Sequence, residues 1–348
     1  MTLHLPPIPP LNRDSEAAAR ARQDTLTKPP GSLGRLESLA AQLAAITGQP
    51  IPTVARKAVI VMAGDHGVAA SGVSAYPSAV TPQMVLNFVR GGAAVNVLAR
   101  HAGARVVVVD VGVAADFDGH PGLLKRKIAL GTQNLILGPA MTRAQAEAAL
   151  QVGLDTVATE IDQGLDLVAT GDMGIGNTTP SAAIVAAITG APVAQVTGRG
   201  TGVDDAGLAR KVAAIEQALS VNQPDPADAL DVLTKVGGLE IAGLAGVMLG
   251  AAARRVPVVV DGFISGAAAL IAAGLAPAVT GYLIPAHRSV EIGHRVLLAH
   301  LGLEPLFDLD LRLGEGTGAV LAFHLIEAAA RLHAEMATFA EAGVSDKA

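Results

Sequence analysis

Five short segments of this chain are rich in Val, Ile and Ala, and each runs into glycine. They read KAVIVMAG (57–64), ARVVVVDVG (104–112), DLVATGDMG (166–174), APVAQVTG (191–198) and VPVVVDG (256–262). Most are followed by an Ala- and Leu-rich stretch with helical spacing. Near-continuous apolar strands that alternate with helices are typical of a parallel sheet covered on both faces. The pattern predicts an α/β fold in which a mostly parallel, Rossmann-like sheet is flanked by helices.

An acidic residue stands beside a glycine, or one residue away from it, at the end of four predicted strands. These residues are Asp65, Asp110, Asp172 and Asp261. In open parallel sheets, ligands bind beyond the carboxyl ends of the strands. One such acid is compatible with an ordinary turn, whereas four of them predict a shared crevice.

The two ends of the chain have a different, helical pattern. Residues 14–47 read as two helices broken at KPPGSLGR (28–35), and 317–343 read as one long Ala-rich helix. We expect residues 1–50 and 317–348 to form a small helical lobe beside a large α/β catalytic domain, 51–316. The uncharged stretch 262–287 is long enough for a membrane span, but its Ala, Gly and Pro content favours a buried helix followed by a strand.

The composition excludes several classes of function. The chain has no Cys, which rules out disulfides, thiolate catalysis and Cys-ligated zinc. The net charge of −6 and the aromatic content of 2% argue against nucleic-acid binding and favour an aliphatic ligand pocket. The N-terminus lacks the pattern of a signal peptide, so we expect a cytoplasmic protein.

Two glycine-rich segments are candidates for phosphate binding. In GDMGIGNTTPSAAIVAAI (171–188), backbone N–H groups at a helix start would form an anion site. An ordinary capped turn is the alternative, because Asn and Thr are good caps. In GRGTGVDDAGLARK (198–211), Arg199 or Lys211 would pair with a phosphate, or Asp204 and Asp205 would simply start a helix.

The histidines do not have metal-ligand spacing. Asp65 and His66 are adjacent, and HRSVEIGH (287–294) places two His seven residues apart. Hydrogen-bonded structural histidines are the favoured interpretation, and we expect no metal and no cofactor. Residues 76–100 predict an amphipathic helix broken at Gly91 and Gly92, whose Met84, Leu86 and Phe88 belong to the core or to an apolar pocket.

Seven motifs together resemble those of one enzyme family. In chain order they are KPPGSLGRLE (28–37), GDHGV (64–68), GDMGIGNTTPSAA (171–183), GRGTGVDD (198–205), DGFISGAAAL (261–270), HRSVEIGH (287–294) and LRLGEGTGA (311–319). Any one of them is weak, but seven in order over nearly the whole chain closely resemble the nicotinate-nucleotide–dimethylbenzimidazole phosphoribosyltransferases (the CobT family). The resemblance implies transfer of phosphoribose from nicotinate mononucleotide to 5,6-dimethylbenzimidazole, giving α-ribazole 5′-phosphate and nicotinate. It also implies a homodimer without a required metal.

The resemblance implies a role for two carboxylates. The pyridinium leaving group is already cationic and departs without an acid, so the reaction calls for one base to take the benzimidazole proton. The family places this role on the glutamate that matches Glu315, with Leu313 against the benzimidazole ring. Asp172 is the second carboxylate, which would stabilise positive charge on the ribose; family members often have Glu at this position.

The resemblance also implies two sets of binding residues. The phosphate and ribose set comprises Gly174, Gly176, Asn177, Thr178, Gly200, Lys211, Ser265 and Ser289. The benzimidazole set comprises Tyr76, Gln83, Met84, Met173 and Leu313.

Three other functions are weaker alternatives. An NAD-dependent oxidoreductase would need G-x-G-x-x-G followed by an acid ~20 residues later, which no stretch supplies. A transferase that uses pyrophosphorylated ribose would usually carry paired acids after a strand, and these strands carry one each. A non-catalytic nucleotide sensor would not need the glutamate in LGEGTGA.

Overall fold

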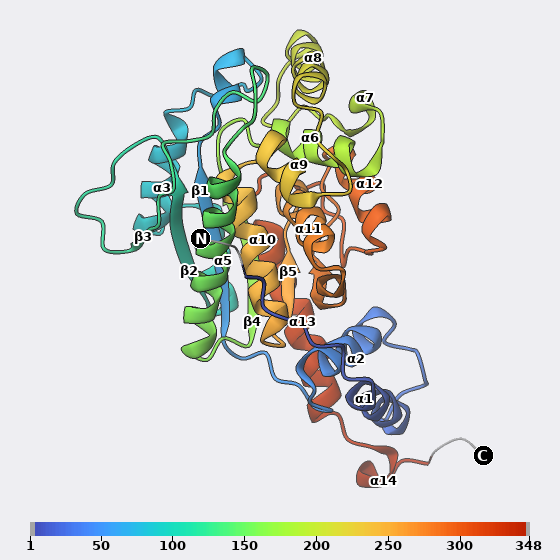
Figure 1. The fold of residues 1–348 in the computed structure, drawn as a ribbon. Coiled ribbons are helices and arrows are strands. Elements are labelled where there is room, and N and C mark those ends of the chain that lie inside the picture. Colours follow the sequence, from blue (N-terminus) through green and yellow to red (C-terminus); the bar gives the residue numbers. More distant parts are fainter. Residues whose placement is uncertain (1–3, 346–348) are drawn as a thin grey trace.

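One parallel sheet of six strands organises the structure, a computed structural model that describes residues 4–345. The strand order is β3-β2-β1-β4-β5-β6, and every neighbouring pair is parallel (Figure 1). The predicted α/β fold with a parallel, Rossmann-like sheet is confirmed. The strands are β1 (Lys57–Gly64), β2 (Ala104–Gly112), β3 (Leu123–Lys125), β4 (Leu167–Met173), β5 (Val258–Val260) and β6 (Leu283–Pro285).

One predicted strand is wrong, and one strand of the structure was not predicted. The segment 191–198 is not a strand but contains the short helix α7 (Val193–Val196), and Pro192 is its N-cap. Proline lacks the N–H that an interior strand must donate, so it favours this helix start over a ladder. The edge strand β3 was not predicted, because three residues carry too little pattern.

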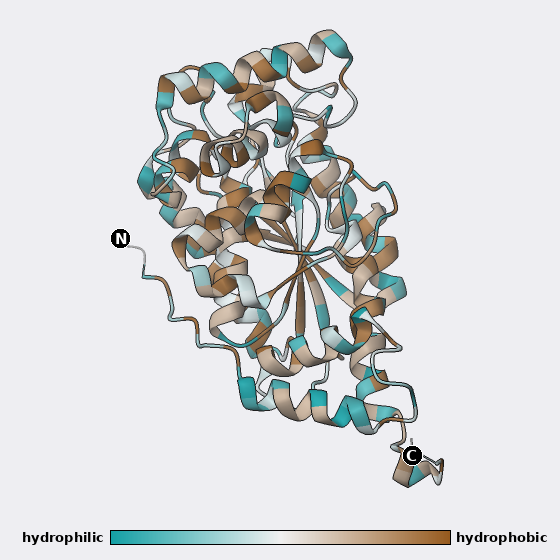
Figure 2. Ribbon diagram, turned by 90° about the vertical axis from the view of Figure 1, so that its right-hand side faces the viewer, coloured by the Kyte–Doolittle hydropathy of each residue, from teal (hydrophilic) through white to brown (hydrophobic). Residues whose placement is uncertain are grey.

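Both faces of the sheet are covered by helices. Along β1, Ala58, Ile60 and Met62 belong to one buried cluster, with residues of α5 (Arg143–Asp162) and α10 (Leu239–Ala253). The alternate residues Val59, Val61 and Ala63 belong to the other, with α4 (Ala94–Ala102) and α13 (Thr317–Glu335). Figure 2 shows the resulting arrangement, in which brown apolar strands lie in the centre and hydrophilic colour lies on the outer helices.

Further helices surround the carboxyl ends and the edges of the sheet. They are η1 (Gly67–Ser71), α3 (Val80–Arg90), α6 (Thr178–Thr189), α8 (Asp205–Asn222), α9 (Ala229–Val236), α11 (Phe263–Leu275), η2 (Pro277–Tyr282) and α12 (Ile292–Leu301). The stretch 262–287 is thus the buried helix α11, η2 and strand β6, as predicted. Within residues 4–345, no helix is both long and apolar enough to cross a membrane.

The chain ends lie together. Helices α1 (Arg13–Thr25) and α2 (Arg35–Thr47) pack on each other, and both contact α13, which also contacts β1, β4 and β5 (Figure 1). The predicted single helix over 317–343 is wrong at its end. α13 stops at Glu335 because the backbone becomes extended at Met336. Thr338 then forms a β-bridge with Leu26, and the short helix α14 (Phe339–Ala342) follows. The division into two domains remains a prediction.

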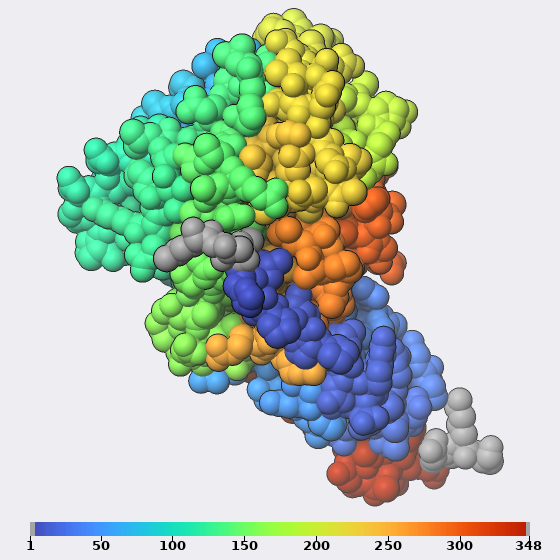
Figure 3. Space-filling model, viewed as in Figure 1, coloured from blue at the N-terminus to red at the C-terminus, as the bar shows by residue number. Residues whose placement is uncertain are grey.

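The segment before α1 runs over the outside of the molecule (blue in Figure 3). The carbonyl of Pro9 accepts a hydrogen bond from the Tyr282 hydroxyl at 2.8 Å, and that of Pro10 accepts one from Arg255 at 3.0 Å. These contacts fasten the segment before α1 to η2 and to the loop that follows α10.

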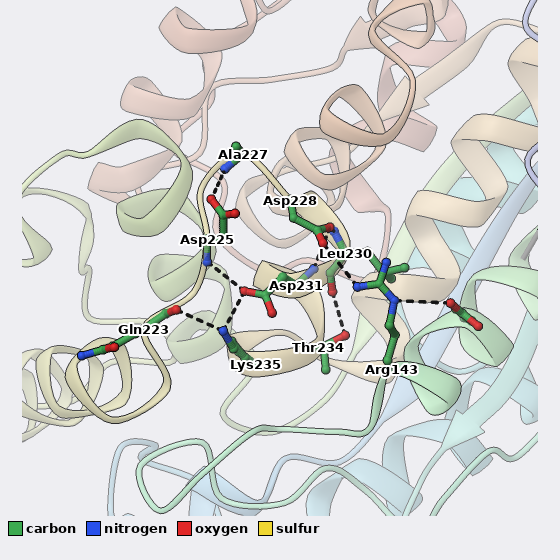
Figure 4. Close-up of polar contacts among 10 residues, drawn as sticks. Arg143, Gln223, Asp225, Ala227, Asp228, Leu230, Asp231, Thr234 and Lys235 are labelled. Atoms are coloured by element: carbon green, nitrogen blue, oxygen red, sulfur yellow. Dashed lines mark hydrogen bonds and ion pairs between the residues drawn. The ribbon is translucent and has the colours of Figure 1, made fainter.

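A polar cluster holds the start of α9 (Figure 4). Asp228 caps the helix by accepting from the N–H groups of Leu230 and Asp231. Arg143 of α5 pairs with Asp228 at 3.3 Å, and Lys235 pairs with Asp231 at 2.9 Å. None of these side chains borders the main cavity, so we assign the cluster a structural role.

Candidate active site

A cavity of about 320 Å³ opens where β4, β5 and β6 end. Residues after these strands form its floor, and α3 and the segment 312–315 form its walls. It is lined by Tyr76, Val80, Met84, Asp172, Met173, Gly174, Ile175, Asn177, Thr178, Gly200, Thr201, Asp261, Gly262, Phe263, Ile264, His287, Ser289, Glu291, Arg312, Leu313, Gly314 and Glu315. The lining is largely apolar but contains four carboxyl groups, so it suits a ligand with an apolar ring and some positive charge.

Glu315 lies in a tight left-handed turn at this cavity. Gly314, Glu315 and Gly316 all have positive φ, at 80°, 63° and 92°. This conformation costs a residue with a side chain roughly 1–2 kcal/mol, and such strain is concentrated at functional sites. The turn also passes so close to β4 that a Cβ on Gly171 would lie 2.3 Å from the Glu315 carbonyl oxygen. The glycines around Glu315 therefore make its position possible.

Asp261, directly after β5, holds this turn in place through hydrogen bonds. Its two carboxylate oxygens accept from the backbone N–H groups of Gly316 at 3.2 Å and Ala319 at 2.9 Å. Burial raises the pKa of Asp261 to about 7, although these N–H groups act to lower it. The Asp261 carboxyl group thereby joins the end of a strand to the start of α13.

The Glu315 side chain is buried and faces the cavity. Its Oε2 accepts one long hydrogen bond, 3.4 Å, from the backbone N–H of Val95 at the start of α4. Burial raises the pKa of Glu315, and the Val95 N–H opposes the shift. A carboxylate with a raised pKa and few hydrogen bonds is suited to accept a proton near neutral pH.

Asp172 lies beside this turn. A Cβ on Gly314 would come within 3.2 Å of both Asp172 carboxylate oxygens, and Asn177 donates to Asp172 at 2.8 Å. Burial first, and then the charges of Asp261 and Glu240, raise the pKa of Asp172 well above its ordinary value, while Asn177 lowers it. The cavity therefore concentrates acid groups whose charge is costly until a cation enters.

Lys211 of α8 does not line the cavity, but it contacts Thr178, which does. Its ammonium donates to the Thr178 hydroxyl at 2.6 Å and to the Gly198 carbonyl at 3.3 Å. Burial lowers the pKa of Lys211 to about 8, and the nearby Glu291 opposes this shift. Asp204 caps α8 by accepting from Gly207, so the segment 198–211 provides both the helix cap and the inward-facing lysine considered above.

The cavity brings together eleven of the fifteen residues predicted for the site. Four of them, Gly176, Lys211, Ser265 and Gln83, do not border it. Tyr76 and Leu313 are 54% and 58% exposed, which places them at the rim. The roles of all fifteen residues remain predictions.

Of the four strand-end acids, only Asp172 and Asp261 border the cavity. The predicted crevice shared by all four is therefore wrong. Asp65 accepts from the N–H of Ala114, and Asp110 pairs with Lys127 at 3.0 Å. Asp65 follows β1 and Asp110 lies in β2, away from β5 and β6, and both carboxylates interact with nearby loops.

His66 is a buried structural residue. It hydrogen bonds to Glu240 at 2.7 Å, and neither side chain is exposed. Burial opposes the charged imidazole, but the Glu240 carboxylate outweighs it and raises the pKa of His66. Within residues 4–345, no three His, Asp or Glu side chains are arranged to hold a metal ion.

Several lining residues were not singled out from the sequence. Glu291 and His287 belong to HRSVEIGH, and Arg312 belongs to LRLGEGTGA. Arg312 donates to the Gly200 carbonyl at 3.1 Å and so connects two loops of the cavity. The signal was their place inside motifs already quoted, but motif position alone does not show which side chains point inward.

The chain is similar over nearly its whole length to known phosphoribosyltransferases. The family model described as phosphoribosyltransferase matches residues 8–344. A nicotinate-nucleotide–dimethylbenzimidazole phosphoribosyltransferase of Roseiflexus sp. (strain RS-1) is 66% identical over 340 residues, which cover 98% of this chain and 96% of that protein. The chain belongs to this phosphoribosyltransferase family.

Further members agree over the full length. The Geobacter sulfurreducens phosphoribosyltransferase is 59% identical, with 99% of this chain and 98% of that protein covered. The crystal structure of the phosphoribosyltransferase from Thermus thermophilus superposes with a TM-score of 0.92 at 50% identity, over 97% of this chain and 100% of that one. The resemblance drawn from the seven motifs is confirmed.

Proposed function

We propose that the protein transfers the phosphoribosyl group of nicotinate mononucleotide to 5,6-dimethylbenzimidazole, yielding α-ribazole 5′-phosphate and nicotinate for cobalamin assembly. Membership of the family supports the reaction. The single observation that supports the chemistry is the buried Glu315 carboxylate, which faces a mainly apolar cavity at the strand ends.

In the proposed step, one benzimidazole nitrogen attacks C1′ of the ribose as the bond from C1′ to the pyridinium nitrogen breaks. The electron pair of that bond goes to the pyridine nitrogen, which leaves neutral. The proton on the other benzimidazole nitrogen goes to Glu315 as general base. Attack opposite the leaving group inverts C1′ from β to α.

Asp172 is proposed to stabilise positive charge on the ribose. It does so only in its ionised form, and its raised pKa in the empty cavity opposes ionisation. The pyridinium of the substrate provides the compensating positive charge, because a nearby cation lowers the pKa of a carboxyl group. The acid-rich cavity thus discriminates in favour of a cationic leaving group.

The 5′-phosphate is proposed to bind at the start of α6. Asn177 and Thr178 border the cavity there, and Gly200 and Ser289 also line it. The ammonium of Lys211 reaches this region through Thr178. A helix N-terminus and a lysine together compensate a phosphate dianion.

The test is nicotinate release, measured by chromatography, from nicotinate mononucleotide with and without dimethylbenzimidazole. We expect release only when the benzimidazole is present, with α-ribazole 5′-phosphate formed in equal amount. Absence of release in both mixtures, without and with magnesium, would overturn the proposal.

A further inference from the structure

Arg312 is the only lysine or arginine that borders the main cavity within residues 4–345. The one histidine of the lining, His287, has a pKa lowered by burial, so it is neutral near pH 7. Four carboxyl groups border the same cavity and repel an anionic ligand whenever they are ionised. Arginine keeps its charge at every pH at which proteins are folded, so Arg312 supplies the permanent positive charge of this site.

The guanidinium of Arg312 is anchored but is not neutralised. Its Nη1 donates to the Gly200 carbonyl at 3.1 Å. No carboxylate of the part of the chain that the structure describes lies within 4 Å of it. A guanidinium has five N–H donors, and the residue is exposed, so the other donors are open to a ligand.

Gly200 places Arg312 beside the proposed phosphate site. A Cβ on Gly200 would lie 2.8 Å from the hydroxyl of Thr178, the first residue of α6, and 3.2 Å from the Lys211 ammonium. The carbonyl of the same glycine accepts from Arg312. Lys211 and Arg312 therefore approach one loop residue that itself lines the cavity.

Arg199, which belongs to the same loop, is differently engaged. Its guanidinium pairs with Asp205 and donates to the Val203 carbonyl at 3.0 Å. It does not border the main cavity. Of these two arginines, only Arg312 combines free donors with a place at the cavity.

We propose that Arg312 binds the 5′-phosphate together with Lys211 and makes the enzyme prefer a nucleotide over the corresponding nucleoside. A guanidinium can donate two parallel N–H groups to phosphate oxygens. Arg312 is three residues from Glu315, so phosphate binding would also steady the segment that carries the proposed base. This inference rests on the proposed function for the identity of the nucleotide.

The ring carboxylate of nicotinate is the other anionic group of the substrate. The contacts favour the phosphate, because the hydrogen-bond partner of Arg312 lies against the first residue of α6 and the Lys211 ammonium. A helix N-terminus and a lysine are typical partners of a phosphate. The experiment therefore separates the two anions.

The test compares nicotinate mononucleotide with two analogues. Nicotinate riboside lacks the phosphate, and nicotinamide mononucleotide lacks the ring carboxylate. For each we measure kcat/KM with saturating dimethylbenzimidazole and the dissociation constant by calorimetry. Arg312→Ala should lower kcat/KM for both nucleotides by ~10–100-fold, the range for a lost hydrogen bond to a charged group. It should leave kcat/KM for the riboside nearly unchanged.

Two further variants sharpen the comparison. Arg312→Lys keeps the charge and loses the paired donors, so it should restore part of the preference for nucleotides. Arg254→Ala is the matched control, because Arg254 is an arginine whose side chain is 51% exposed and pairs with Asp162 at 3.0 Å, outside the cavity. It should leave all ratios unchanged.

The inference is overturned if Arg312→Ala lowers kcat/KM for the riboside and both nucleotides by one common factor, as a purely structural link between two loops predicts. It is also overturned if the variant spares nicotinamide mononucleotide alone, which would assign Arg312 to the ring carboxylate, or if it spares all three substrates.

Failure of the proposed function has a different signature, namely no nicotinate release by the wild type from any of the three substrates. Even then the dissociation constants decide the inference. Arg312→Ala should weaken binding of the two nucleotides by the same ~10–100-fold and should not weaken binding of the riboside.

Discussion

The carboxylate of Asp261 accepts a hydrogen bond of 3.2 Å from the backbone N–H of Gly316, the residue that follows Glu315. This contact ties the left-handed turn that carries Glu315 to the end of β5. The position of the proposed base therefore depends on a second acid that does not itself act on the substrate in the proposed step.

Asp261→Asn should change the pH dependence of stability. Because the pKa of Asp261 rises from an ordinary 3.8 to about 7 on folding, the folded state keeps this proton up to a higher pH than the unfolded state does. The contribution of Asp261 to the free energy of unfolding is therefore complete below about pH 4. It is lost as the pH rises to 7, by about 1.4 kcal/mol per pH unit. Urea unfolding of both proteins between pH 4 and 8 should show the variant gaining relative stability with pH.

Parallel curves for the two proteins would contradict a raised pKa for Asp261. The variant loses one acceptor at every pH, which lowers the whole curve by ~1–3 kcal/mol and does not affect the slope.

Gly316→Ala should remove both stability and activity. Its φ is 92°, and an added Cβ would lie 2.6 Å from Val59 Cγ2. We expect the free energy of unfolding to fall by ~2–4 kcal/mol, from the left-handed backbone and the clash together. Gly103→Ala is the control, since it has φ 63° and no atom within 4 Å of the added Cβ. Equal losses in the two variants would show that the close approach at Gly316 does not matter.

Lys211→Met should weaken nucleotide binding. In the wild type, kcat/KM for nicotinate mononucleotide should fall above pH 8, because Lys211 with a pKa of about 8 loses its charge there. The variant should show kcat/KM lower by ~10–100-fold at pH 7, the range for a lost charge-assisted hydrogen bond, and no further fall above pH 8.

Lys235→Met is the control for this profile, because its ammonium pairs with Asp231 in the cluster of Figure 4. A variant of Lys211 that retained the wild-type fall above pH 8 would remove Lys211 from nucleotide binding.

The sequence predicted the sheet well where a strand is a long apolar run. The bounds of β1 and β2 agree to the residue, because continuous apolar runs that end in glycine have few other uses. The same apolar composition misled at 191–198, where Pro192 decides in favour of a helix. Apolar composition predicts that a segment is buried, but it does not predict whether the backbone N–H groups of that segment form hydrogen bonds to a neighbouring strand.

The site was predictable in its residues and not in its geometry. The motif with Glu315 was recognised, but nothing in LGEGTGA states that three consecutive residues have positive φ. Nor does it show that Asp261, more than fifty residues earlier, holds the turn. Such contacts arise from the packing of strand ends that are distant in sequence, which local patterns do not encode.

The central claim is that Glu315 takes the benzimidazole proton. The most direct measurement is the rate of nicotinate release by Glu315→Gln with saturating dimethylbenzimidazole, beside wild type and the exposed control Glu304→Gln. Gln keeps the size of the side chain and has a similar cost at positive φ, so folding should be little changed. We predict that kcat falls by ~10²–10⁴-fold, the range for a lost general base, with the KM for nucleotide little changed. A Glu315→Gln enzyme with near wild-type kcat would contradict the account.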